Sequence, residues 1–299
     1  MENFEYFEPR TLREAVRLLL KFKRGTKLLA GGTDLMFAMK SGWIKPKYLI
    51  NLKKITGLDK INYSKKDGLK IGALATWTDI LSSKPVKQYY PILRDAAALI
   101  GCPQIRNMGT IGGNICHASP SADSAPALMV YGAQCVLAGP GKERIIPIEK
   151  IFAGVQKTSC KPGEILKEFR LPAPDPKSKG CYLKFSPRKA MDLPIVGVGV
   201  LLRASNGTFE DVKIALGAVA PTPIRAKKAE KFLTGKPIKE EWVREAAEET
   251  ARESKPITDM RASQEYRLGL IRELTCRAIM MSSAKDHPLP LSQLIWGKP

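Results

Sequence analysis

Apolar residues recur at helix and strand spacing along most of the chain. In the first stretch they predict an amphipathic helix over residues 11–23, with Thr11 and Glu14 at capping-box spacing and Gly25 as its stop. Further runs predict strands over residues 27–30, 48–51, 69–72, 134–138 and 164–171, and helices over residues 35–39, 92–100 and 124–131. Strands and helices therefore mix in the first half of the chain.

The pattern changes after residues 171–180, a stretch rich in proline, lysine and glycine that predicts a domain boundary. Beyond it, strands are predicted over residues 181–186, 195–203 and 209–219, and helices over residues 224–232, 241–253 and 264–281. Strands followed by helices indicate an α+β lobe. We expect a first domain over residues 1–174, with subdomains of about 1–57 and 58–174, a lobe over 175–285, and an extended tail over 286–299.

Composition narrows the class of protein. The 299 residues are 44% hydrophobic and include no apolar run of about 18 residues, so we expect no membrane span. The amino-terminal residues do not resemble a secretory signal, and we expect a cytoplasmic protein. The net charge of +20 allows three explanations: nucleic-acid binding, a basic surface for an acidic subunit or anionic cofactor, or a general property of the host proteome. The basic residues are scattered and no nucleic-acid motif is present, so we expect no nucleic-acid partner.

The six cysteines show no metal-ligand spacing, since no C-x-x-C motif occurs. In a long chain without a secretory signal, we expect free buried thiols rather than disulfides, and no metal site. Cys102 and Cys116 in particular are expected to be small buried hydrophobic residues.

Two glycine-containing turns are the best candidates for binding chemistry. Residues 31–34 (Gly-Gly-Thr-Asp) and 110–114 (Thr-Ile-Gly-Gly-Asn) each follow an apolar segment. Consecutive amides in such a turn can form a nest for an anion, and two converging nests would hold a diphosphate from two sides. A single such turn is more often only a turn. Neither has the form GxGxxG or a Walker loop, which argues against a Rossmann dinucleotide site and a P-loop NTPase.

The sequences around both turns resemble those of one protein family. LLAGGTDLM (residues 28–36) resembles the first FAD motif of molybdenum-hydroxylase flavin subunits, and QIRNMGTIGGNICHASPSADSAPAL (residues 104–128) is similar to their second. The resemblance extends over about residues 4–282. The family includes the medium subunit of aerobic carbon monoxide dehydrogenase and the middle domain of xanthine dehydrogenase. It implies an α+β fold: a two-part FAD-binding domain of the vanillyl-alcohol-oxidase (PCMH) type, followed by a smaller α+β carboxy-terminal lobe.

The resemblance also implies which residues contact the cofactor. The amides of residues 31–33 would bind the FAD diphosphate, residues 110–114 would form a second wall, Asp123 would accept from cofactor hydroxyls, and Lys184 would lie near the flavin ring. Each of these residues also has an ordinary structural explanation. Asp123 could cap a helix, Lys184 could be a solvated surface lysine, and Ile100 and Leu166 could be plain core residues. The complete set of expected FAD contacts is Leu28, Leu29, Ala30, Gly31, Gly32, Thr33, Asp34, Leu35, Ile100, Thr110, Ile111, Gly112, Gly113, Asn114, Asp123, Leu166 and Lys184.

The implied function is electron transfer, with no catalytic side chains of the chain's own. FAD would be bound non-covalently, with His117 as a local hydrogen-bonding residue. The implied partners are a small subunit with [2Fe-2S] clusters and a large molybdenum-cofactor subunit in a dimer of heterotrimers, and the implied acceptor is NAD, a quinone, another carrier or oxygen. The alternatives are a stand-alone FAD-dependent oxidoreductase of the same fold, a basic nucleic-acid-binding or scaffold protein without cofactor, and an assembly factor.

Overall fold

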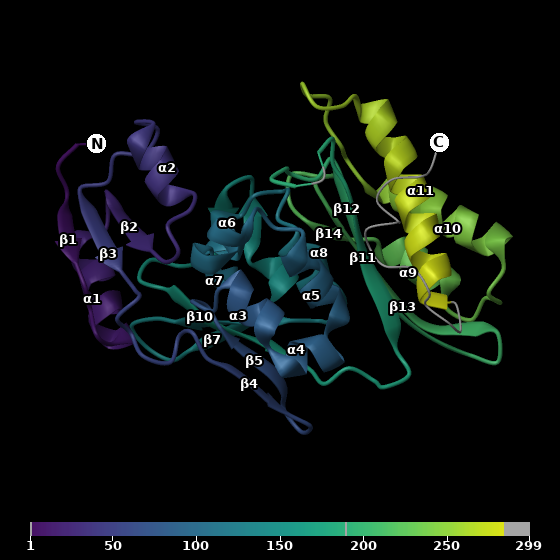
Figure 1. The fold of residues 1–299 in the computed structure, drawn as a ribbon, viewed down its shortest axis with the longest axis horizontal. Helices are drawn as coiled ribbons and strands as arrows, with labels where there is room; N and C mark the ends of the chain where they lie inside the picture. Colours follow the sequence, from purple (N-terminus) through teal and green to yellow (C-terminus); the bar gives the residue numbers. More distant parts are fainter. Residues whose placement is uncertain (1, 189, 284–299) are drawn as a thin grey trace.

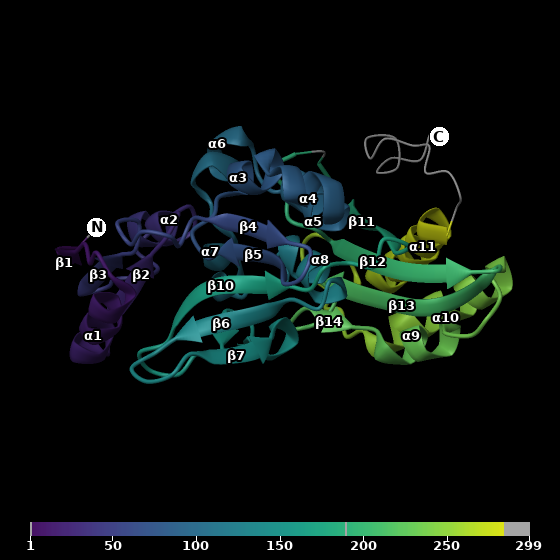
Figure 2. The same cartoon turned by 90° about the horizontal axis from the view of Figure 1, so that it is seen from below.

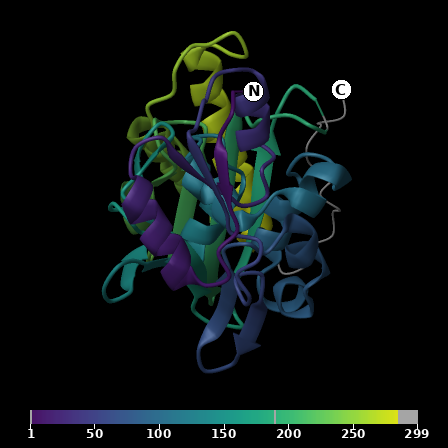
Figure 3. The same cartoon turned by 90° about the vertical axis from the view of Figure 1, so that its left-hand side faces the viewer.

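The amino-terminal part of the molecule is a small parallel sheet between two helices (Figures 1 and 3). The structure, a computed structural model, describes residues 2–188 and 190–283, so the predicted tail over residues 286–299 lies outside the described residues. The sheet has the order β1-β3-β2. Its elements are β1 (Glu5–Phe7), α1 (Leu12–Phe22), β2 (Thr26–Leu29), α2 (Leu35–Lys40) and β3 (Tyr48–Asn51).

The predicted cap of α1 is present with one change. The Thr11 hydroxyl accepts from the Glu14 amide at 3.1 Å, as a capping box requires. The Glu14 carboxylate, however, accepts from the amide of Arg10 at 3.0 Å rather than from that of Thr11. Both ends of the entry turn are therefore held by side chains, and the helix begins where the sequence predicts.

The central part is a five-stranded antiparallel sheet with helices over one face (Figure 2). The strand order is β4-β5-β10-β6-β7. The strands are β4 (Ile61–Ser64), β5 (Gly68–Gly72), β6 (Gln134–Ala138), β7 (Arg144–Pro147) and β10 (Ile165–Leu171). The helices are α3 (Trp77–Ser82), α4 (Lys84–Tyr89), α5 (Pro91–Ala98), α6 (Pro103–Met108), α7 (Ile111–His117) and α8 (Ser124–Val130). A short arm follows β7: η1 (Ile148–Lys150), β8 (Phe152–Gly154) and β9 (Lys157–Thr158).

The carboxy-terminal lobe is an antiparallel sheet of order β11-β12-β13-β14 that lies between two layers of helices (Figures 1 and 2). Helix α11 packs on β11 and β12, while α5 and α8 of the central part pack on the same sheet. The elements are β11 (Lys179–Phe185), β12 (Val196–Ser205), β13 (Thr208–Gly217), β14 (Ile224–Arg225), α9 (Lys227–Leu233), α10 (Glu240–Glu253) and α11 (Gln264–Ser283). The contacts of α5 and α8 with this sheet hold the lobe against the central part.

Most predicted elements are present, but the helix predicted over residues 224–232 is partly wrong. Its first residues form strand β14, because Ile224 and Arg225 pair with Leu216 and Ala215 of β13, and the helix starts only at Lys227. The sequence also missed α3, α4 and α6, each only six residues long, which is too short for a clear helical period. In the part of the chain that the structure describes, no helix has the length and hydropathy to cross a membrane.

Candidate functional site

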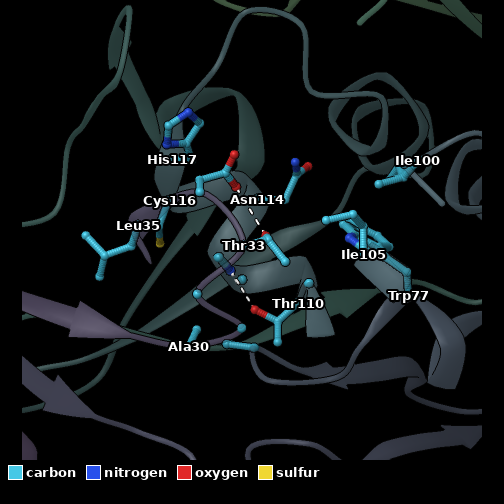
Figure 4. A pocket seen from close by; sticks show the side chains of 18 of the residues that line it. Ala30, Thr33, Leu35, Trp77, Ile100, Ile105, Thr110, Asn114, Cys116 and His117 are labelled. Atoms are coloured by element: carbon cyan, nitrogen blue, oxygen red, sulfur yellow. Dashed lines mark hydrogen bonds between the residues drawn. The ribbon is translucent and has the colours of Figure 1, made fainter. Parts of the chain in front are cut away.

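A cavity of about 470 Å³ opens where the three parts of the molecule meet (Figure 4). Such a volume is in the range of cofactor sites. The loop between β2 and α2 and helix α7 both line it, and the loop between β11 and β12 contributes Met191, Asp192 and Leu193. Fourteen of the seventeen expected contact residues line it: Leu28, Ala30, Gly31, Gly32, Thr33, Asp34, Leu35, Ile100, Thr110, Gly112, Gly113, Asn114, Asp123 and Leu166.

The first glycine turn presents open backbone to this cavity. Gly32 has φ +82, a conformation that favours glycine. A Cβ on Gly31 would lie 2.1 Å from the carbonyl oxygen of Met108, so only glycine fits against α6 there. Within the described residues, the amides of Gly31, Gly32 and Thr33 donate to no protein acceptor. These amides are therefore available to an anion, and the predicted nest stays a prediction.

The second glycine segment is not a turn, and this expectation is wrong. Thr110 is the N-cap of α7 and its hydroxyl accepts from the Gly113 amide at 3.1 Å, so both glycines lie in the first turn of a helix. The Gly112 amide donates to the carbonyl of Ala73 at 2.9 Å. Because these amides already have acceptors, they are not a second open nest. A Cβ on Gly112 would lie 2.5 Å from the Ala73 oxygen, so glycine here allows α7 to pack against that strand end.

The two glycine segments are neighbours, as expected. A Cβ on Gly113 would lie 3.8 Å from the Cβ of Ala30, which directly precedes the first glycine pair. The first glycine turn and the start of α7 therefore line the cavity side by side (Figure 4). This arrangement suits an extended anionic ligand that approaches the backbone closely.

Asp123 and Lys184 form a buried ion pair between the central part and the carboxy-terminal lobe. The Lys184 Nζ lies 2.9 Å from the Asp123 carboxylate, and the two side chains are only 5% and 7% exposed. Lys184 also donates to the carbonyls of Asp192 at 2.7 Å and Leu99 at 3.3 Å. The Tyr182 hydroxyl donates to the other Asp123 oxygen at 2.7 Å. Lys184 is therefore not a solvated lysine.

Burial and these partners act on the Asp123 carboxyl in opposite directions. Desolvation is the largest effect and raises its pKa, while the charge and hydrogen bond of Lys184 and the hydroxyl of Tyr182 lower it. The pKa of Tyr182 is raised well above its usual range by burial and by the same carboxylate. Asp123 occupies the N-cap position of α8 but makes no capping hydrogen bond with its side chain. Its carboxylate instead accepts from Tyr182 and Lys184 of the carboxy-terminal lobe.

Three expected contact residues do not line the cavity with their side chains. Leu29 packs in a small cluster with Met39 and Leu49, and Ile111 is fully buried in the main core. Lys184 borders the cavity only through Asp123 and Asp192. Any contact that these residues make with a cofactor stays a prediction.

Several lining residues were missed or misjudged from sequence. Cys116 is exposed to the cavity and Cys102 is half-buried, so the expectation that both are buried hydrophobes is wrong. Trp77, Ile105 and Ser121 line the cavity but were not among the expected contacts, although Ile105 and Ser121 lie within the second matched motif. The sequence does hold a signal for the helix that carries Trp77, because Thr76 and Asp79 form a capping box at the start of α3.

Comparisons with known proteins identify the family. Residues 2–174 match the family model described as FAD binding domain in molybdopterin dehydrogenase, and residues 181–282 match that of the CO dehydrogenase flavoprotein C-terminal domain. The chain belongs to the flavin subunits of the molybdenum hydroxylase family. It is an oxidoreductase subunit that binds FAD, and the predicted two-part FAD domain with an α+β lobe is confirmed.

Relatives within the family match over nearly their full length. The chain is 33% identical over 276 residues to the xanthine dehydrogenase FAD-binding subunit of Escherichia coli O157:H7, covering 92% of this chain and 94% of the relative. It is 34% identical over 283 residues to the carbon monoxide dehydrogenase medium chain of Hydrogenophaga pseudoflava, covering 95% and 98%. A solved carbon monoxide dehydrogenase from that organism superposes with a TM-score of 0.91 at 35% identity, covering 94% of this chain and 97% of that one.

Proposed function

We propose that this chain is the electron-transfer subunit of a heteromeric molybdenum hydroxylase, which takes electrons from a [2Fe-2S] subunit and passes them to an external acceptor. The observation that carries the proposal is the row of free amides at residues 31–33, which line the same cavity as the glycines of α7. Bound FAD supplies the redox chemistry, because it can exchange electrons singly or in pairs. The protein's own contribution is to bind, orient and tune it.

We propose that the first nest binds the FAD diphosphate non-covalently. Amides of Gly31, Gly32 and Thr33 would donate to the phosphate oxygens, while Gly112 and Gly113 let the cofactor lie close to α7. The fit rests on three consecutive amides that donate to no acceptor within the described residues, on a loop that lines the cavity. Apolar side chains such as Ile100 and Leu166 would pack against the rings.

The buried pair of Lys184 and Asp123 supports a tuning role. The ammonium group is fixed behind the cavity wall by three oxygen acceptors from Asp123, Asp192 and Leu99. It offsets the negative charge of the Asp123 carboxylate that lines the cavity, so this wall would oppose negative charge on reduced flavin less than an unpaired carboxylate would. The same contacts leave neither group free to act as a general acid or base, which disfavours a stand-alone oxidoreductase.

Exposed apolar residues near the cavity support a docked partner. Phe37 is 58% exposed and Trp43 is 75% exposed, their rings pack edge to face at 5.3 Å, and they directly precede the cavity-lining residues Ala38 and Ile44. Met191 and Leu193, which line the cavity, are 53% and 54% exposed. Large apolar side chains gathered beside an open cofactor site are typical of a protein interface. We propose that the partners are a [2Fe-2S] subunit and a molybdenum-cofactor subunit in a dimer of heterotrimers, in the cytoplasm.

The proposal is tested by comparing the FAD-loaded chain alone with the chain plus its iron–sulfur and molybdenum subunits. The chain alone should oxidise no aldehyde or aromatic heterocycle, whereas with its partners the flavin absorbance should bleach when substrate is added. Reoxidation by NAD or by a quinone then identifies the acceptor.

A matched pair of variants separates docking from cofactor binding. Trp43→Ser removes an exposed ring next to the cavity-lining residue Ile44 and should slow flavin reduction by partners while FAD content stays unchanged. Met260→Ser alters a fully exposed side chain outside the cavity lining and should have no effect. Turnover of substrate by the FAD-loaded chain alone would overturn the proposal in favour of a stand-alone oxidoreductase.

A further inference from the structure

Strand β12 begins with an alternation of valine and glycine. Val196, Val198 and Val200 are fully buried in the core of the carboxy-terminal lobe. Successive positions of a strand face opposite sides of the sheet, so Gly197 and Gly199 face the central part of the molecule. The sheet is therefore free of side chains at two positions on the face where α8 packs (Figure 1).

This bare face brings the start of α8 close to the sheet. A Cβ on Gly199 would lie 3.2 Å from the backbone of Pro126, and a Cβ on Gly217, which pairs with Gly197, would lie 3.3 Å from the Pro126 ring. Asp123 directly precedes α8 and lines the cavity. The close approach of α8 places Asp123 within reach of side chains on β11, the neighbour of β12.

Tyr182 on β11 uses the space above Gly197. Its side chain is fully buried, and its hydroxyl donates to the Asp123 carboxylate at 2.7 Å. A Cβ on Gly197 would lie only 2.5 Å from that hydroxyl oxygen, so a side chain at position 197 would displace it. The hydroxyl reaches the carboxylate because residue 197 is a glycine.

The Asp123 carboxylate keeps acceptor capacity for a ligand. Tyr182 donates to Oδ1 and Lys184 donates to Oδ2, so the carboxylate cannot turn without losing a bond. No other group of residues 2–188 and 190–283 donates to it. A carboxylate offers about four acceptor positions, so roughly two remain on a group that lines the cavity.

We propose that Tyr182 is a positioning residue for FAD. Its hydroxyl holds the Asp123 carboxylate so that the remaining acceptor positions meet a hydroxyl group of the bound cofactor, and Gly197 keeps the space that this requires. The inference rests on the proposed function, in which FAD occupies the cavity that Asp123 lines. Tyr182 lies behind the residues that line the cavity and acts through Asp123.

The test compares two hydroxyl deletions in the full chain, titrated with FAD after the bound cofactor has been removed. Tyr182→Phe keeps the buried ring and should weaken FAD binding by about three- to tenfold, the size of one hydrogen bond. Tyr90→Phe is the matched control, because Tyr90 is equally buried in the same core and its hydroxyl donates to the carbonyl of Pro172 at 3.0 Å. It should leave FAD affinity unchanged.

The midpoint potential of the bound flavin distinguishes positioning from a merely structural role. Loss of the Tyr182 hydroxyl leaves more uncompensated negative charge on the Asp123 carboxylate, which opposes electron uptake by the flavin. The potential of Tyr182→Phe at pH 8 should therefore be lower than that of the wild-type protein. Tyr90→Phe should keep the wild-type potential.

Combined variants test whether Tyr182 acts through Asp123. In a background of Lys184→Met and Asp123→Ala, which carries neither charge, Tyr182→Phe should change FAD affinity by less than about twofold. Gly197→Ala should weaken FAD binding as Tyr182→Phe does. Adding Gly197→Ala to Tyr182→Phe should cause little further loss, because the atom that the new Cβ would meet first is gone.

Two results would overturn the inference. One is an equal loss of FAD affinity in Tyr182→Phe and Tyr90→Phe, and the other is an undiminished effect of Tyr182→Phe in the background without Asp123. Matching far-ultraviolet spectra of the variants exclude misfolding. Gly32→Ala probes the proposed diphosphate site separately: if it binds FAD normally while Tyr182→Phe does not, only the diphosphate site is contradicted.

Discussion

Replacing Lys184 with methionine should destabilise the protein strongly and in a pH-dependent way. The side chain is only 5% exposed and is paired at 2.9 Å with Asp123. Lys184→Met keeps the aliphatic volume but leaves a buried carboxylate without its counter-charge. Breaking a buried ion pair from one side costs about 3–5 kcal/mol, which is the loss of unfolding free energy we expect at pH 8.

The pH dependence follows from the Asp123 carboxyl. Burial already raises its pKa above the ordinary value of 3.8, and Lys184 is the first effect that lowers it, so the variant's pKa rises further. The folded state then binds the proton more tightly than the unfolded state, and unfolding free energy falls as pH rises through the window between the two pKa values. The slope is at most about 1.4 kcal/mol per pH unit, and the deficit should be smaller at pH 5 than at pH 8.

Urea unfolding of the FAD-free protein at both pH values measures these deficits. Lys184→Met combined with Asp123→Asn removes both charges and keeps an acceptor for Tyr182, so it should recover most of the stability and lose the pH dependence. Lys213→Met is the control: its partner Asp211 lies 3.7 Å away at the surface, and its loss should cost less than about 1 kcal/mol. The reasoning is refuted if the single variant loses under 1 kcal/mol at pH 8, or loses as much at pH 5.

Three further variants test other parts of the account. Gly32→Ala should weaken FAD binding by at least about tenfold in a fluorescence titration, whereas Gly42→Ala, at φ +75 with open space around it, should cost similar backbone strain of about 1–2 kcal/mol without affecting FAD. Thr110→Ala removes the N-cap hydroxyl of α7 and should lower unfolding free energy by about 1 kcal/mol, with recovery in Thr110→Ser. Asp259→Asn removes the charge partner of the buried Arg267, at 2.8 Å, and should cost about 2 kcal/mol in thermal unfolding at pH 7; equal melting temperatures would contradict this. Asp259 has a lowered pKa, so its contribution should be lost as pH falls below the unfolded value.

Local pattern alone predicted much of the secondary structure. Strands β3 and β6 have the bounds expected from their apolar runs, and α1 begins at its predicted cap. These elements satisfy the same rule in the sequence and in the fold, because their buried faces repeat at the period of the element. Short helices such as α6 carry too few residues to show any period.

The site was predicted less completely, and the reasons are tertiary. Two adjacent glycines are unfavourable in a helix, yet Gly112 and Gly113 are helical because packing against Ala73 and the Thr110 cap outweigh propensity. The ion pair of Asp123 and Lys184 joins residues 61 positions apart, a contact that no local pattern encodes. The matched motifs, rather than spacing, pointed to both of these residues.

The central claim is that the open amides of residues 31–33 bind the FAD diphosphate while α7 supplies a close-packed floor. Electron density of the FAD-loaded protein tests it most directly. The account predicts phosphate oxygens within hydrogen-bonding distance of the Gly31, Gly32 and Thr33 amides, with the Gly112 amide still donating to Ala73. Density that places the diphosphate away from the Gly31–Thr33 amides would contradict it.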